Sequence, residues 1–339
     1  NLMDVYLDAV FNPSIYDIKE IFLQEGWHYH LENKDDDLIY RGVVYNEMRG
    51  ALSGADAQVG DQILEALYPD TIYGKESGGD PYEIPSLTYE AFLDFHKKLY
   101  HPSNSYIFIY GNGDIERFMA HIENNYLAGY ERLDVDSSIA WQDAFAAAKK
   151  VETTYSVAQD ADTEGKDILA YAVSMGTRKT PKDIYVQEVL SEVLINAQAG
   201  PLKNALLAAG LGEDISDFSN DGIQIPFGVV AKDTDAARAG EFEQIVEDTL
   251  RQLVRDGIDK EQLVAAVNRM EYALREANGY TTRGIIYYID AMETWLYDGS
   301  PFDALCYNEA LSELRRDIDS DYYERYIEEH ILNNPHKVV

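Results

Sequence analysis

The residue best placed to do chemistry is Glu47, within the tract Gly-Val-Val-Tyr-Asn-Glu-Met-Arg-Gly at positions 42–50. At helical spacing Val43 and Ala51 share a face with Glu47, beside a stripe of further apolar side chains. A carboxylate among such neighbours loses hydration, which is unfavourable unless a cation, a metal or hydrogen-bond donors meet it. Two readings therefore stand: a partnered acid, or a solvent-exposed surface residue beside Arg49.

A second possible metal site consists of two alternating histidines. His28 and His30 would lie on one face of a strand, with Glu32 next along it, and this spacing can bind zinc. No further ligand is near them in the sequence, which argues against a metal. Cys306 beside Leu305 is better explained as a small core residue than as a nucleophile.

The charge of the chain limits its partners. The formal net charge is −33 over 339 residues, which argues against nucleic acid and anionic membrane surfaces. It could attract basic peptides, or it could be only a solvated shell. The run 35–37, three aspartates, is expected to be solvated and lacks the spaced acids and glycine of a calcium-binding EF-hand.

Composition indicates a folded protein with room for two domains. Apolar residues make up 46% of the chain, and no apolar run approaches the length of a membrane span. The single cysteine excludes an internal disulfide and fits a reducing compartment, so a cytoplasmic location is expected.

Several elements must position Glu47. Periodicity predicts helices over 1–12, 15–25 and 59–67, and a helix through Glu47 itself. Thr88 and Asp114 are predicted N-caps of two further helices, and residues 106–111 are predicted to form a strand between them.

The second half has its own pattern. Strands are predicted over 168–175 and 223–231, with Pro226 indicating an edge or a bulge. Thr180 followed by Pro181 predicts a capped helix, and Asp259 with Gln262 predicts a capping box. Residues 136–150 read as a connector between domains 1–135 and 151–339.

Several segments resemble insulinase-like (pitrilysin) zinc metallopeptidases, in the presequence-protease branch. Besides 42–50, they are Glu-Gly-Trp-His-Tyr at 25–29, Ser-Gly-Gly-Asp-Pro at 77–81, His-Pro-Ser-Asn at 101–104, Gly-Pro-Leu-Lys-Asn-Ala-Leu at 200–206 and Trp-Leu-Tyr-Asp at 295–298. The resemblance also includes 1–11 and keeps its order along the chain. It implies an α+β fold of two tandem sandwich domains, with mostly antiparallel sheets covered by helices.

The resemblance also implies a zinc site to which Glu47 is the third protein ligand. The family's inverted H-x-x-E-H helix supplies two histidines and the general base. None of the seven histidines stands in that motif: His28, His30, His96, His101, His121, His330 and His336. Both chain ends look cut, so we expect an internal piece of a longer zinc metalloendopeptidase, with the first domain truncated at its N-terminus.

The expected parent degrades short unstructured peptides in a closed chamber. The piece itself should have no catalytic residues, no activity and no tightly bound zinc; its partners should be peptide substrates and the missing remainder of its own chain. Two alternatives stay open: a non-catalytic structural or partner subunit of the same fold, and a peptide-binding module.

Overall fold

The computed structural model describes residues 2–178, 180–276 and 282–339. The chain divides into two compact units, unit 1 with Asn1–Ala57 and Glu76–Ile139, and unit 2 with Gln58–Lys75 and Ala140–Val339. The predicted domain limits stay a prediction. None of the described helices is long and apolar enough to cross a membrane.

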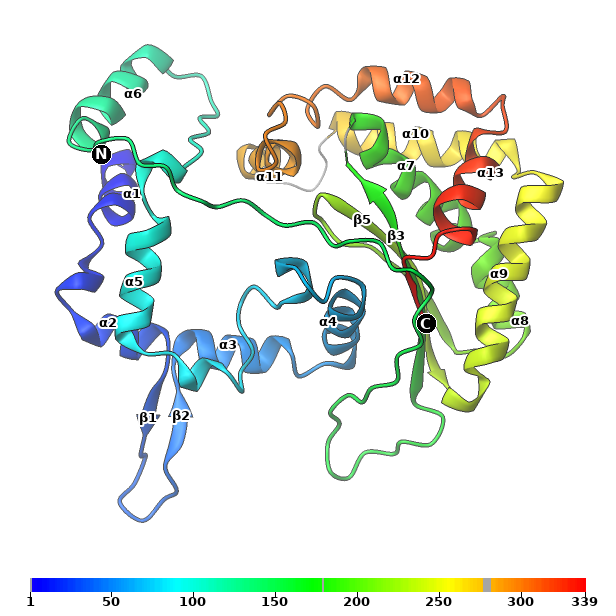
Figure 1. Ribbon diagram of the computed structural model, residues 1–339, viewed down its shortest axis with the longest axis horizontal. Helices are drawn as coiled ribbons and strands as arrows, with labels where there is room; N and C mark the ends of the chain where they lie inside the picture. The colour runs from blue at the N-terminus through cyan, green and yellow to red at the C-terminus, as the bar shows by residue number, and fades with distance from the viewer. Residues whose placement is uncertain (1, 179, 277–281) are drawn as a thin grey trace. The chain divides into compact units, whose positions relative to one another are not determined.

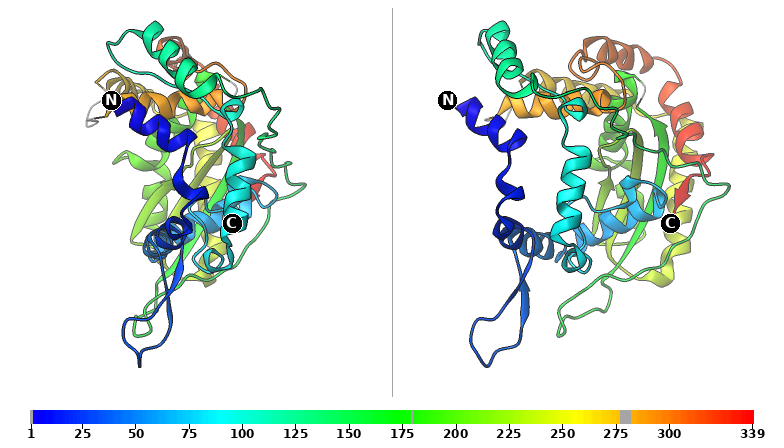
Figure 2. Two further views of the ribbon diagram at one scale, coloured as in Figure 1. Left: turned by 90° about the vertical axis from the view of Figure 1, so that its left-hand side faces the viewer. Right: turned by 60° about the vertical axis from the view of Figure 1, so that its left-hand side comes forward.

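Unit 1 is mainly helical (Figure 1). Its elements are α1 (Leu2–Phe11), η1 (Ser14–Tyr16), α2 (Lys19–Glu25), β1 (His28–His30), β2 (Ile39–Arg41), α3 (Val43–Ala51), η3 (Ile84–Ser86), α5 (Tyr89–Leu99), η4 (Pro102–Asn104), α6 (Ile115–Ile122) and η5 (Glu123–Leu127). Strands β1 and β2 pair antiparallel, with Tyr29 opposite Tyr40. This hairpin extends away from the helices of the unit in every view (Figures 1 and 2).

Local signals in unit 1 were good predictors of helix starts. The Thr88 side chain accepts from the backbone N–H of Ala91, and Asp114 accepts from that of Arg117. The predicted strand at 106–111 is wrong, because these residues have no strand assignment. A strand needs a paired neighbour, and local β propensity cannot supply one.

Unit 2 contains a four-stranded antiparallel sheet in the order β4-β5-β3-β6. Its strands are β3 (Asp167–Thr177), β4 (Asp214–Phe218), β5 (Gln224–Thr234) and β6 (Lys337–Val338). The remaining elements are η2 (Ile72–Gly74), α7 (Pro181–Ser191), η6 (Glu192–Asn196), α8 (Pro201–Ala208), η7 (Ala236–Arg238), α9 (Ala239–Asp256), α10 (Lys260–Glu276), α11 (Arg283–Trp295), α12 (Asn308–Asp317), α13 (Tyr322–Ile327) and η8 (Glu328–Leu332). Helix α4 (Ala55–Leu67) lies mostly in this unit. The predicted α+β class is confirmed.

The core of unit 2 lies between one face of this sheet and helices α7 to α10. Tyr171 and Val173 of β3 and Phe227 of β5 point into it and are fully buried. Ala170 and Ala172 alternate with them and face the other side, as period-2 geometry requires. The two faces therefore carry different sets of side chains, and both are apolar.

Most of the predictions for this half were right. Strand β4 pairs with β5 only from Gly228 to Lys232, so Pro226 lies where that side of β5 has no partner, and the pairing with β3 is irregular between Ser174 and Thr177, where Pro226 stands opposite Ser174. Thr180 does form a reciprocal capping box, with Asp183. Asp259 instead accepts from the backbone N–H of Glu261.

Candidate functional site

The start of the Glu47 helix is set by a close backbone approach. Gly42 precedes α3 with φ +154°, and a Cβ there would collide with the carbonyl oxygen of Gly26. The backbone N–H of Tyr45 donates to the same oxygen at 3.3 Å. Only glycine fits such an approach, so the glycine of the 42–50 tract joins α3 to the base of the β1–β2 hairpin.

Of the two possibilities that the sequence left open for Glu47, the structure shows the solvent-exposed surface residue. It is exposed, and among the described residues it has no hydrogen bond or ion pair. No residue of α3 is buried, and Val43 and Val44 are 42% and 38% exposed. The carboxylate is thus hydrated and free, beside apolar side chains that nothing in the described part of unit 1 covers.

The described residues do not form a zinc site. Across 2–178, 180–276 and 282–339 there is no group of three or more histidine, cysteine, aspartate or glutamate side chains that could hold a metal. A catalytic zinc takes three protein ligands and a water. Among the described residues, Glu47 belongs to no such group.

The alternating histidines are engaged in ordinary hydrogen bonds. Their rings share one side of β1, with centroids 6.1 Å apart. His28 Nδ1 donates to the carbonyl oxygen of Leu23 at 2.7 Å, and His30 Nε2 is 2.9 Å from Glu32 Oε2. The bond from His30, with Arg41 nearby, lowers the pKa of Glu32. These contacts favour ordinary hydrogen bonding over a metal site.

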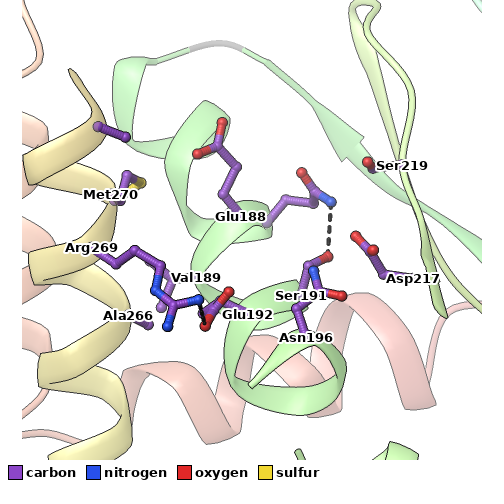
Figure 3. A pocket seen from close by; sticks show the side chains of 12 residues that line it. Glu188, Val189, Ser191, Glu192, Asn196, Asp217, Ser219, Ala266, Arg269 and Met270 are labelled. Atoms are coloured by element: carbon purple, nitrogen blue, oxygen red, sulfur yellow. Dashed lines mark hydrogen bonds and ion pairs between the residues drawn. The ribbon is translucent and has the colours of Figure 1, made fainter. Parts of the chain in front are cut away.

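A polar pocket in unit 2 was missed by the sequence reasoning (Figure 3). Its volume is about 270 Å³, and α7 with η6, the end of β4 and α10 line it with Gln187, Glu188, Val189, Ser191, Glu192, Asn196, Asp217, Ser219, Ala266, Arg269, Met270 and Ala273. The available signal was a polar stripe at helical spacing, Gln187 with Ser191 and Glu188 with Glu192.

Hydrogen bonds and an ion pair organise this pocket. Gln187 Nε2 donates to Ser191 Oγ at 3.1 Å, and Arg269 Nη1 lies 2.8 Å from Glu192 Oε1 (Figure 3). Glu188 projects from α7 into the recess without a partner among the described residues.

The electrostatics around Glu188 are unfavourable to its charge. Although solvent reaches this side chain, the loss of hydration in the recess raises the pKa of Glu188 to about 7. The carboxylates of Glu293, Asp221 and Asp290 add to the rise, and the Arg178 guanidinium opposes it. Arg178 itself forms an ion pair with Glu293, in which Nη1 lies 2.9 Å from Oε2. The two side chains are 6% and 18% exposed.

Comparisons with known proteins agree with the fold. Residues 86–270 match the family model described as peptidase M16 inactive domain. Protein HypA of Clostridium perfringens is 46% identical over 99% of this chain and 35% of that protein, and presequence protease 1, chloroplastic/mitochondrial, of Arabidopsis thaliana is 36% identical over 100% and 32%. The chain belongs to the peptidase M16 family, so the resemblance to insulinase-like peptidases is confirmed.

Solved structures show the same fold. A protease from Helicobacter pylori superposes with a TM-score of 0.65 at 14% identity, covering 87% of this chain and 68% of that one. A peptidase M16 inactive domain from Pseudomonas fluorescens gives 0.62 at 18% identity, with the same coverage. The chain spans about a third of the length of the curated relatives it matches.

Proposed function

We propose that this chain is part of a zinc-dependent metalloendopeptidase that degrades short unstructured peptides inside a closed chamber. The observation that carries the proposal is Glu47, a free carboxylate on an uncovered helix, within a chain of the peptidase M16 family. In the intact protein Glu47 would be one zinc ligand, and residues outside this chain would supply the others. The chain by itself would neither hold zinc tightly nor hydrolyse peptides.

The packing of unit 1 supports a covering partner from the rest of the same protein. Its buried hydrophobic side chains among the described residues are Phe22, Ile84 and Ile122. Tyr6 of α1 and Phe95 of α5 are 68% and 58% exposed. Apolar faces of this size need a neighbour, and the relatives are about three times longer than this chain.

Zinc content tests the proposal directly. In a full-length protein that contains this chain, Glu47→Gln should abolish stoichiometric zinc and peptide hydrolysis, whereas Glu90→Gln on α5 should change neither. Retention of full zinc occupancy by Glu47→Gln would overturn the ligand role. In the isolated chain, one equivalent of zinc bound with sub-micromolar affinity would contradict the proposal of an incomplete site.

A second candidate is a non-catalytic structural or partner subunit of the same fold. It is favoured by the family model itself, which describes an inactive domain over residues 86–270. The discriminator is whether an H-x-x-E-H motif is encoded in the same gene. The cytoplasmic location stays a prediction, since the names of several relatives place them in mitochondria.

A further inference from the structure

The sheet of unit 2 is covered on its second face by a segment from the first part of the chain. Residues 58–75, with most of α4 and the turn η2, lie against the side opposite to α7–α10 (Figure 1). Ile63, Leu67 and Tyr68 are 6%, 0% and 1% exposed there. Each would be an exposed hydrophobic side chain without the sheet.

The sheet contacts this segment through apolar side chains. Ala172 and Val230 pack against the segment, together with Phe145 and Val338. A Cβ on Gly228 would lie 2.9 Å from the carbonyl oxygen of Tyr171 on the neighbouring strand, so this position favours glycine. Ile168 and Phe218 also pack against this cluster, so the segment and the strands share an apolar core.

Polar contacts join the segment to four separate parts of unit 2. Tyr68 Oη donates to Ser174 Oγ on β3 at 3.2 Å, and the backbone N–H of Asp70 donates to Gln142 Oε1 at 2.9 Å. Gln62 Nε2 donates to the carbonyl oxygen of Thr154 at 2.8 Å. The hydroxyl groups of Tyr73 and Tyr297 also share a hydrogen bond.

We propose that residues 58–75 form a latch, a segment that folds with unit 2 and leaves the sheet only when that unit unfolds. Residues 52–54 alone separate α4 from α3. A three-residue connection therefore joins the helix of Glu47 to a segment that folds with unit 2.

Hydrogen exchange of the 339-residue chain across a denaturant series tests the latch. Amides of 58–75 should open together with those of β3 and β5, and amides of 43–51 should open earlier. If 58–75 instead opens with 43–51, the latch is refuted. The measurement needs no zinc, so its failure leaves the ligand role of Glu47 untouched, and loss of that role leaves the latch standing.

Two variants test whether residues 58–75 unfold together with unit 2 or detach from it separately. Leu67→Ala should accelerate exchange about 30-fold or more in both 58–75 and β3, while Leu87→Ala in unit 1, where the side chain is 53% exposed, should change neither. Acceleration confined to 58–75 would contradict the proposal.

A milder variant serves if Leu67→Ala does not fold. Tyr68→Phe removes only the hydroxyl that donates to Ser174, and it should accelerate both regions about five-fold. Tyr82→Phe, at a side chain 88% exposed in unit 1, is the matched control and should have no effect. Equal exchange in Tyr68→Phe and the parent would count against the latch.

Discussion

His336 Nε2 donates a hydrogen bond of 2.8 Å to the backbone carbonyl oxygen of Leu67, a residue 269 positions earlier. The bond is buried, and the His336 ring also packs on Phe145 with centroids 4.1 Å apart. It satisfies a carbonyl group at the last residue of α4, where no later residue of the helix can do so. His336 therefore caps the C-terminal end of α4, which belongs to the latch segment 58–75.

The burial of His336 makes the stability of unit 2 depend on pH. Burial lowers the pKa of His336, so the folded state holds the ring neutral. The neutral ring stabilises unit 2 fully above the ordinary histidine pKa of about 6.5, and this stabilisation is lost as the pH falls below that value. Acidification from pH 7 to 5 should lower the free energy of unfolding of unit 2 at this site, measured by urea unfolding. His336→Gln should remove that loss, whereas His101→Gln in unit 1 should keep it.

Glu188 should make unit 2 less stable as the pH rises, which is opposite to the effect of His336. Its pKa of about 7 exceeds the ordinary value, so the folded state favours the protonated acid and stability falls as pH rises from about 4.5 through 7. Glu188→Gln should therefore stabilise unit 2 at pH 8 and leave it nearly unchanged at pH 4. Solvent in the open pocket should limit the gain to about 1 kcal/mol. A gain of equal size at both pH values would show that the charge is not responsible.

The capping box of α7 should contribute measurable stability. The Thr180 hydroxyl group accepts from the backbone N–H of Asp183, whose carboxylate accepts in return from the backbone N–H of Thr180. Thr180→Ala should lower the free energy of unfolding of unit 2 by about 1 kcal/mol, and Thr180→Ser should restore most of it. Equal loss in both variants would point to the Thr180 methyl group instead.

Local chemistry explains what the sequence predicted well. The caps at Thr88, Asp114 and Thr180 depend on side chains within three residues of the bonds they make, so the sequence alone predicts them. The apolar run of β3 was also predicted as a strand, and its central residues are buried in the sheet.

Contacts between residues far apart in the chain explain what could not be predicted from the sequence. Leu67 was predicted to end the helix over 59–67 and Tyr68 to follow it. No local pattern says that this helix covers a sheet more than 100 residues away, as the bond from Tyr68 to Ser174 shows. The pocket around Glu188 also combines distant elements, since Asp217 and Arg269 meet it from β4 and α10. Glu47 was placed on the correct helix, α3, while its role as a zinc ligand stays a prediction.

Metal analysis of the full-length protein is the most direct test of the central claim that Glu47 completes a zinc site. The account predicts about one zinc per parent protein, near zero in Glu47→Gln, and an unchanged value in Glu90→Gln, with unit 2 equally stable in all three. Full zinc content and activity in Glu47→Gln would contradict it.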